Sequence, residues 1–359
     1  MKDLFQGRKV LVCAGTGGVG KTTLAATLGI IAARAGRKTL VLTIDPAQRL
    51  AQALGLDKKI GVDVAVPSVP GLWASLIDPS REFDEFVLGS IDKGLARELF
   101  NNRLYQQLSN NLSGSQEFTS LVRLLNSVRS GQYDLVILDT PPTQNAVDFL
   151  KAPERLHALF QETVISWFAD PSAGEGWIKR AIHRGTRLVT QALEAVTGSS
   201  FIAELKDFFS HISHLRGRVS EVTAEVGKLL HAKDTGFLLI TGFDETKLKE
   251  ALEFQIDMRE EKLNLQAVIV NRWFPEWAGG EGRWPADWEK NPDFKKLREL
   301  HEKFSEFFGE RQEAYERFEK RLGKAVTVIK LPDFQNTVQG LQDLEQVAQT
   351  LNEKWRTQS

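Results

Sequence analysis

The segment of the chain best suited to chemistry lies near its start and reads GTGGVGKTT, from Gly15 to Thr23. It fits G-x-x-x-x-G-K-[ST], a pattern whose glycines let successive backbone N–H groups point at phosphate oxygens. In such a loop Lys21 would reach the β- and γ-phosphates, and the Thr22 hydroxyl would bind Mg²⁺. The predicted nucleotide-binding residues of this loop are Gly15, Gly17, Gly18, Val19, Gly20, Lys21, Thr22 and Thr23.

Two aspartates come directly after apolar runs that read as strands. Asp45 comes after the run 38–44, and Asp139 comes after the run 134–138. Because an open α/β sheet binds its ligands at the carboxyl ends of the strands, both are placed to reach a phosphate-bound metal. Asp139 takes the position of a Walker B carboxylate, which accepts a hydrogen bond from a Mg²⁺-bound water or from Thr22. Thr22, Asp45 and Asp139 are the predicted metal-site residues, although aspartate beside proline is also common in turns.

The base of the nucleotide is indicated by the two residues that directly follow another apolar run. Guanine-specific P-loop proteins commonly carry an [NT]KxD element, and this chain has no convincing copy of it. Asn271 and Arg272 stand instead after the run LQAVIV. An asparagine side chain can both donate to and accept from an adenine edge. The sequence therefore favours ATP over GTP, with Asn271 and Arg272 as further nucleotide-binding residues.

The elements around the glycine-rich loop support this interpretation. A β-type run at 10–13 precedes the loop and a helical pattern at 23–35 comes after it, so a chance glycine-rich turn is the weaker alternative. Further along, strands alternate with helical stretches, which predicts an α/β fold with a mostly parallel sheet of roughly seven strands flanked by helices. The predicted strands are 9–14, 38–44, 72–77, 134–138, 235–241, 265–270 and 325–330.

Two long stretches, about 79–130 and 152–233, have apolar residues at helical spacing and no strand character. Because the two faces of the sheet can hold only a limited number of helices, we expect these insertions to form a helical subdomain of a single ATPase domain spanning 1–359. A third helical run, 292–323, is densely charged, and we expect it to be a solvated amphipathic helix. The C-terminal run 341–355 has an apolar face and should pack on the sheet.

Composition restricts the possible partners and the compartment. The chain has 359 residues, 42% of them hydrophobic, and a formal net charge of −1, which gives no indication of nucleic-acid binding. No apolar stretch approaches the length of a membrane span, and the first nine residues do not resemble a signal peptide. We therefore expect a cytoplasmic protein with no transmembrane segment.

Five segments, taken together, resemble the ArsA family of ATPases. In chain order they read GTGGVGKTT, TIDPAQRL, ILDTPPTQNAVDFL, VNRWFP and IKLPDF. This family includes the arsenite-pump ATPase and the ATPase that targets tail-anchored membrane proteins, and it is more distantly similar to MinD and ParA. The resemblance covers the sheet elements across essentially the whole chain. It implies a P-loop NTPase that hydrolyses ATP with Mg²⁺.

The resemblance also implies roles for individual residues in a face-to-face dimer that sandwiches ATP and closes as ATP is hydrolysed. The Asp45 segment becomes switch I, and the Asp139 segment becomes switch II. Asp45 would orient or polarise the attacking water, and Lys21 would be the second catalytic residue. Asn271 would contact adenine, and Pro332 would lie near the base. Such a switch would couple ATP binding and hydrolysis to the binding of a protein client or partner.

One residue of the loop departs from the family pattern, which usually reads G-K-G-G-x-G-K-T. The early lysine, which in the family reaches across the dimer to the partner's phosphates, is Thr16 in this chain. A homodimer would lack one cation at each site, and losing such a cation can slow phosphoryl transfer by orders of magnitude. Either Arg49 or Arg272 substitutes, or a lysine-bearing paralogue completes a heterodimer.

Two branch-specific sites of the family are missing from this chain. The targeting branch carries a CxxC zinc clasp after the asparagine segment, where this chain reads WAGGEGRWPADW. The arsenite branch uses cysteine thiolates, whereas Cys13 is the one cysteine here and should be buried in the first strand. The sequence therefore predicts neither a zinc site nor an arsenite site.

The sequence carries little information about a client. Six apolar residues of the second insertion are candidates for a client groove, but ordinary core packing is the more common use of such residues. They are Leu156, Leu159, Phe160, Ile165, Trp167 and Phe168. Two other functions stay open: a positioning ATPase like MinD and ParA, and a nucleotide-binding pseudoenzyme that needs a lysine-bearing paralogue.

Overall fold

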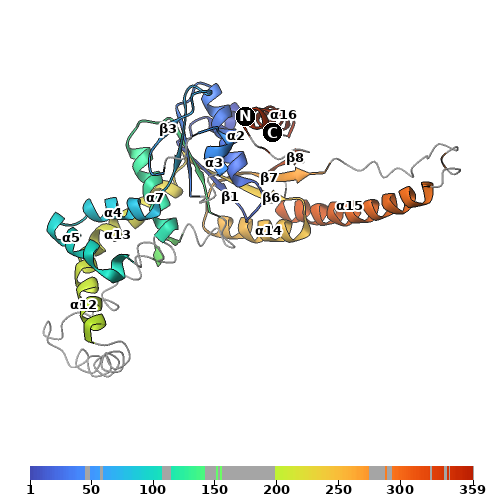
Figure 1. Ribbon diagram of the computed structural model, residues 1–359. Helices are drawn as coiled ribbons and strands as arrows, with labels where there is room; N and C mark the ends of the chain where they lie inside the picture. Colours follow the sequence, from blue (N-terminus) through green and yellow to red (C-terminus); the bar gives the residue numbers. More distant parts are fainter. Residues whose placement is uncertain are drawn as a thin grey trace.

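The computed structural model describes most of the chain. The described residues are 1–44, 49–56, 60–106, 115–141, 151–152, 154–155, 199–274, 288, 293–323, 326–334, 338 and 340–358. Over these residues the chain forms one central sheet with helices on both faces. A group of helices extends from one side of it and one long helix extends from the opposite side (Figure 1).

The sheet of the described residues has eight strands in the order β3-β4-β2-β5-β1-β6-β7-β8. Their bounds are β1 Val10–Ala14, β2 Thr39–Thr43, β3 Val64–Ala65, β4 Leu72–Leu76, β5 Leu135–Asp139, β6 Thr235–Gly242, β7 Leu265–Trp273 and β8 Thr327–Pro332. All neighbouring pairs are parallel except β3 and β4. The predicted α/β fold with a mostly parallel sheet is confirmed. The edge strand β3 was not predicted, because two residues carry no periodic pattern.

The central strands are buried on both faces, which their sequences explain. Strand β1 reads VLVCA, a continuous apolar run typical of a parallel strand covered on both sides. Successive side chains alternate between the two faces, so Val10 and Val12 join one hydrophobic core whereas Leu11 and Cys13 join the other. The loop after β1 is therefore supported by a strand whose displacement would disrupt the packing of both hydrophobic cores.

The helices divide between the two faces of the sheet. Their bounds are α1 Lys2–Phe5, α2 Lys21–Arg34, α3 Arg49–Ala53, α4 Pro79–Leu88, α5 Lys93–Asn101, α7 Ser115–Arg129, α12 Ser199–Ser213, α13 Arg216–Leu230, α14 Glu245–Glu260, α15 Phe294–Leu322 and α16 Leu341–Gln358. Helices α2 and α16 pack together on one face. Leu344, Val347 and Leu351 of α16 are buried in that core, as predicted for the C-terminal run.

On the other face, α7 and α14 pack against the sheet and α13 packs on α7. Helices α4, α5 and α12 continue away from the sheet (Figure 1). An aromatic cluster of Phe83, Phe86, Tyr105 and Phe118 forms the core of this helical part. Asp78 begins α4 by accepting a hydrogen bond from the Arg81 N–H. Because its aromatic core is contiguous with that of the sheet, this helical part is held at a defined position.

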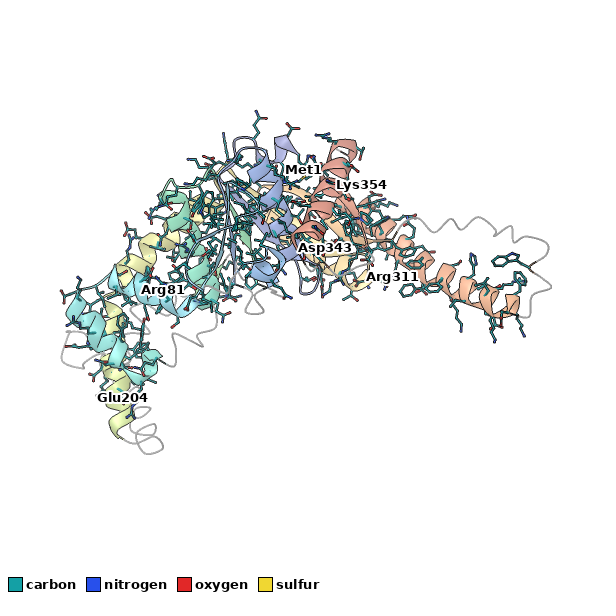
Figure 2. All side chains as sticks on the ribbon, turned by 45° about the horizontal axis from the view of Figure 1, so that its top comes forward. Met1, Arg81, Glu204, Arg311, Asp343 and Lys354 are labelled. Atoms are coloured by element: carbon teal, nitrogen blue, oxygen red, sulfur yellow. The ribbon has the colours of Figure 1, made fainter. Side chains whose placement is uncertain are left out.

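Helix α15 leaves the body of the protein at about Arg311 (Figures 1 and 2). Its C-terminal half is buried against α14 through Ala314, Tyr315 and Phe318. Its N-terminal half extends outward, and several of its large apolar residues are exposed. The run predicted as a solvated amphipathic helix is therefore solvated only in its first half.

Candidate nucleotide site

The predicted site residues meet because three parallel strands end side by side. Strand β1 leads into the glycine-rich loop, and β5 and β2 lie next to it in the sheet, in that order. The register pairs Cys13 with Asp139 and Asp139 with Thr43. Three segments far apart in the sequence are thereby brought to one edge of the sheet, where open α/β sheets bind their ligands.

The glycines of the loop are required by its backbone and by its neighbours. Gly15, Gly18 and Gly20 have φ angles of 148°, 79° and 90°, which side chains rarely allow. A Cβ atom on Gly15 would lie 2.0 Å from the carbonyl oxygen of Ile240 in β6. A Cβ atom on Gly20 would lie 2.5 Å from the side-chain nitrogen of Asn271. The backbone of the loop thus packs closely against β6 and the end of β7.

Helix α2 begins at Lys21, immediately after the loop, and Gly20 at its start provides no side-chain cap. Its first N–H groups therefore remain available to a ligand, together with the positive end of the helix dipole. The Lys21 side chain is 6% exposed, and its Nζ donates to the Thr16 carbonyl oxygen at 2.9 Å. The lysine is thereby folded back over the loop, inside the cradle that the phosphates would fill.

Asp139 lies at the bottom of the site and is 2% exposed. Its Oδ2 accepts hydrogen bonds from the Thr22 hydroxyl at 2.6 Å and from the Thr43 hydroxyl at 2.8 Å. A hydroxyl beside a buried carboxylate is the oxygen donor set that Mg²⁺ prefers next to phosphate. The residues present therefore fit an ATP·Mg²⁺ complex, with Thr22 and Asp139 placed to hold the metal directly or through water.

Thr43 was missed by the sequence interpretation, which used only the aspartate two residues after it. The signal that could have found it is a hydroxyl residue at the carboxyl end of the apolar strand β2. Thr140 was also missed: both its N–H, at 3.2 Å, and its hydroxyl, at 3.0 Å, donate to the Cys13 carbonyl oxygen. These bonds fix the start of the predicted switch II segment to the strand that carries the loop.

Cys13 itself is fully buried beneath the site. Burial, and then the neighbouring Asp139 carboxylate, raise the pKa of its thiol well above its ordinary value. The thiol is thus protonated at neutral pH and inaccessible from solvent. A cysteine in this state has no thiolate to offer a soft metal or metalloid.

The end of β7 completes the described site. The Asn271 side-chain nitrogen donates to the Val19 carbonyl oxygen of the loop at 2.8 Å. The next residue, Arg272, is exposed and has a φ of 55°, and the pairing of β7 with β8 is irregular there. Pro332 pairs with Trp273 beyond this bulge. A bulge of this kind changes the direction of neighbouring side chains, and Asn271 lies within it, in hydrogen-bond contact with the loop.

The other predicted site residues fall into two groups. Gly17, Gly18 and Val19 lie in the loop between β1 and α2, and Thr23 is half-buried in the first turn of α2. Asp45 and the six candidate groove residues lie outside the described residues, as does the side chain of Arg49. Thr16 is 7% exposed, and its hydroxyl has no hydrogen-bond partner among the described residues.

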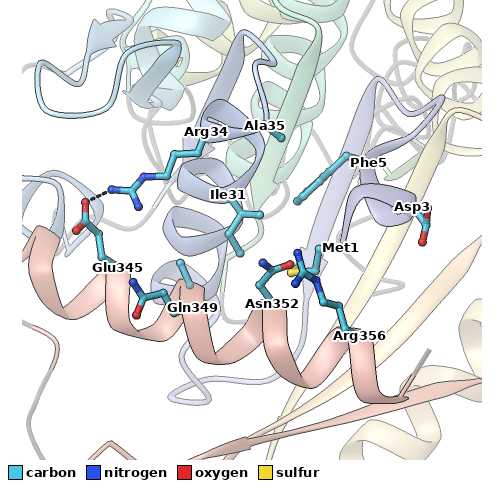
Figure 3. Close-up of a pocket in the computed structure, with 11 residues that line it drawn as sticks. Met1, Asp3, Phe5, Ile31, Arg34, Ala35, Glu345, Gln349, Asn352 and Arg356 are labelled. Carbon is cyan, nitrogen blue, oxygen red and sulfur yellow. Dashed lines mark hydrogen bonds and ion pairs between the residues drawn. The ribbon is translucent and has the colours of Figure 1, made fainter.

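A separate surface pocket of about 450 Å³ lies between α1, α2 and α16 (Figure 3). Ile31 and Arg34 line it from α2, and Arg34 pairs with Glu345 at its edge. These residues belong to the C-terminal end of α2, whereas Lys21 begins the helix. At 1.5 Å per residue the two ends are roughly 20 Å apart, so this pocket is separate from the nucleotide site.

Comparison with known proteins agrees with this geometry. The family model described as "Anion-transporting ATPase" (ArsA_ATPase) matches residues 8–353. A "Putative arsenical pump-driving ATPase 1" of Aquifex aeolicus is 24% identical over 96% of this chain and 78% of its own length. An "ATPase GET3" of Malassezia globosa is 34% identical over 74% of this chain and 72% of its own. An "ATPase ASNA1 homolog 2" of Paramecium tetraurelia is 24% identical over 75% of this chain and 77% of its own length.

Within the described part of the chain, no helix is both long and apolar enough to cross a membrane.

Proposed function

The chain belongs to the ArsA family of anion-transporting ATPases, and from that premise we propose that it is a dimeric switch driven by ATP. ATP binding and hydrolysis would change its affinity for a protein client or partner in the cytoplasm. The observation that carries the proposal is the pair of hydroxyls, Thr22 and Thr43, that converge on the buried carboxylate of Asp139. This arrangement ties the start of both proposed switch segments to the residue that would hold the metal.

The loop residues would bind the triphosphate and neutralise its charge. Lys21 would exchange the Thr16 carbonyl for the β- and γ-phosphates, and the uncapped N–H groups of α2 would donate to the phosphate oxygens. Mg²⁺, when bound, would neutralise part of the charge of the triphosphate. Thr22 and Asp139 would hold it, with the Asp139 carboxylate oriented by the hydrogen bond from the Thr43 hydroxyl.

Asp45 is proposed to orient the attacking water. It stands after β2, two residues beyond Thr43, whose hydroxyl is bound to Asp139. A change in metal coordination at Asp139 would therefore reach the Asp45 segment through one hydrogen bond. This coupling supports a switch in which the state of the γ-phosphate sets the position of both segments.

Asn271 is proposed to contact adenine, with Arg272 and Pro332 beside the base. Their position at the ends of β7 and β8, next to the loop, supports this role. The bond from Asn271 to Val19 would link the base site to the phosphate site, since one side chain serves both. ATP would be preferred over GTP because an asparagine, and no guanine-specific element, stands at this position.

A lysine-bearing paralogue is proposed as the dimer partner. Thr16 is buried in the loop and cannot carry a cation to the phosphates of a second subunit. A protein of this family without that cation is expected to hydrolyse ATP slowly by itself. A homodimer stays the alternative if a basic residue such as Arg49 or Arg272 substitutes.

The hydrolytic function is tested by measuring phosphate release from ATP with the purified protein, Asp45→Asn and Thr16→Lys. We expect slow release by the wild type, and a loss of at least about a hundredfold in Asp45→Asn because the water is no longer oriented. Thr16→Lys should raise the rate about tenfold or more by restoring the cation. Absence of phosphate release from all three proteins would support the alternative, a nucleotide-binding pseudoenzyme that needs a lysine-bearing paralogue.

The heterodimer is tested separately by a pull-down with Asp45→Asn trapped with ATP and Mg²⁺. We expect recovery of a protein whose own loop has lysine at the position of Thr16. The matched control is Lys21→Ala, which should bind no nucleotide and recover no partner. A wild-type protein that dimerises alone on ATP, and turns over at the rate of the mixture, would contradict the heterodimer.

A further inference from the structure

The part of α15 that projects from the body carries a row of exposed apolar side chains. Leu297, Leu300, Phe304 and Phe307 are 38%, 51%, 43% and 45% exposed. They recur at spacings of three, four and three residues, and we call them the α15 stripe. This spacing keeps them on one face of the helix, and it is the spacing of a two-helix seam.

The same face is covered further along the helix. Continuing the spacing from the α15 stripe leads to Arg311, Ala314 and Phe318, of which Ala314 is 6% and Phe318 is 1% exposed. The guanidinium of Arg311 lies over the Phe307 ring at 4.0 Å and separates the exposed part from the buried part. One helix face is thus buried at its root and exposed at its tip, where solvated lysines and glutamates would be the ordinary residues.

The charges beside the α15 stripe indicate which helix can cover it. Lys296, Lys303 and Glu310 directly precede three positions of this helix face, 297, 304 and 311, and so form one flank of it. Consider an antiparallel second copy with Leu297 opposite Phe307. Lys296 of each copy then faces Glu310 of the other, which makes two attractive pairs, and Lys303 faces Lys303 once.

A parallel arrangement has no such complementarity. In that geometry each residue of this flank faces the residue five positions later in the other helix, on the flank formed by the residues that follow Leu300 and Phe307. Lys296 would face His301, and Lys303 would face Phe308, so no pair of opposite charges forms. The charge pattern therefore selects the antiparallel arrangement of two identical helices.

We propose that the α15 stripe is a docking surface for the α15 stripe of a second copy of this chain, packed antiparallel. The contact is small, but the helix is already formed and held by its root, so little conformational entropy is lost on pairing. An affinity on the order of micromolar is expected for eight apolar side chains and two ion pairs. The contact lies outside the nucleotide site and does not depend on the proposed function.

The test is sedimentation equilibrium of the full chain without nucleotide, at concentrations up to about 50 µM, the range where contacts of this size associate. We expect a monomer–dimer equilibrium for the wild type. Leu300→Glu should weaken dimerisation by at least about a hundredfold, because it places two carboxylates in the seam. Lys295→Gln, an equal change of charge on the far side of the helix, should leave it unchanged within about twofold.

The orientation is tested by exchanging charges between two positions. Lys296→Glu alone should weaken dimerisation by about fivefold, since it faces Glu310 of the second copy. Adding Glu310→Lys should restore it, because both pairs are then reversed. In a parallel pair the two positions are about 20 Å apart along the axis, and no restoration is expected.

Three results would overturn the proposal. The first is a wild-type monomer throughout this concentration range, and the second is a dimer that Leu300→Glu leaves intact. The third is a failure of Glu310→Lys to restore the pairing of Lys296→Glu. Phosphate release by Leu300→Glu is measured in parallel, because it reports on the proposed ATPase function independently of dimerisation through the α15 stripe. Its far-ultraviolet circular dichroism shows whether α15 is still helical.

Discussion

At the scale of single residues, Gly15 and Gly18 show that two glycines of one loop can be required for different reasons. Both have positive φ angles, 148° and 79°. A Cβ atom on Gly15 would collide with the Ile240 carbonyl, whereas a Cβ atom on Gly18 would meet no atom within 4 Å. Gly15 is therefore required by packing against β6, and Gly18 only by the backbone conformation.

This difference predicts unequal effects of two alanine substitutions. Gly15→Ala should lower the free energy of unfolding by about 2–4 kcal/mol, because backbone of β6 must shift as well as φ. Gly18→Ala should lower it by about 1 kcal/mol, the cost of a left-handed conformation for alanine. Urea unfolding without nucleotide measures both values. Equal losses in the two variants would show that packing on β6 does not constrain the loop.

At the scale of elements, the helical part is joined to the edge of the sheet by a polar cluster in which Glu82 is buried and its partners are half-buried. Arg123 of α7 pairs with Asp63, just before β3, and its Nε lies 3.5 Å from Glu82 of α4. The Tyr133 hydroxyl donates to Asp63 at 2.9 Å. Burial raises the pKa of Glu82 to about 7, and the nearby Arg123 opposes this only in part.

The raised pKa of Glu82 predicts a pH dependence of stability. Between its ordinary value of 4.5 and about 7, the folded protein binds more protons at Glu82 than the unfolded chain does. The free energy of unfolding therefore falls as pH rises through this interval. Relative to Glu82→Gln, which does not titrate, the wild type should lose on the order of 2 kcal/mol between acidic and neutral pH.

Urea unfolding at several pH values measures this difference. Glu85→Gln is the matched control, since Glu85 lies one turn further along α4 and is exposed. Its stability profile should stay close to that of the wild type, because the Glu85 carboxylate affects the pKa of Glu82 less than burial and Arg123 do. Parallel profiles for wild type and Glu82→Gln would mean that Glu82 keeps an ordinary pKa in the fold.

At the scale of the whole molecule, the end of β7 connects the root of α15 to the phosphate-binding loop. Tyr315 of α15 packs edge-on against Trp273 with ring centroids 4.6 Å apart, and the Lys330 ammonium lies 4.4 Å from both ring centroids. Two residues before Trp273, Asn271 donates to the Val19 carbonyl. A change at the root of α15 can thus reach the nucleotide site through three consecutive residues of one strand.

This connection predicts that Tyr315 contributes to both stability and nucleotide affinity. Tyr315→Ala removes a ring that is 1% exposed and should lower the free energy of unfolding by about 3–5 kcal/mol. The affinity for ATP should fall as well, because the end of β7 loses its support. Tyr315→Phe, which keeps the ring and loses only the hydroxyl bond to Glu319, should cost about 1 kcal/mol. Unfolding in urea and ATP titration calorimetry measure the two effects; an unchanged ATP affinity in a folded Tyr315→Ala would contradict the connection.

The sequence alone determined the elements and chemistry that are local. The loop from Gly15 to Thr23 is recognisable because its glycines, lysine and hydroxyls are contiguous, and the central strands because a continuous apolar run needs no distant partner to be read. Asp139 was predicted to accept from a Mg²⁺-bound water or from Thr22, because each residue lies at a recognisable strand or helix end. The structure shows the hydrogen bond from Thr22.

Only the tertiary structure decided the contacts that depend on strand register and on neighbouring elements. Thr43 meets Asp139 across 96 residues of chain, and Asn271 meets Val19 across 252, so no local pattern could pair them. The two halves of α15 have apolar residues at the same helical spacing, yet α14 buries one half and leaves the other exposed. A pattern specifies which face of a helix is apolar, whereas burial depends on whether another element is there to cover that face.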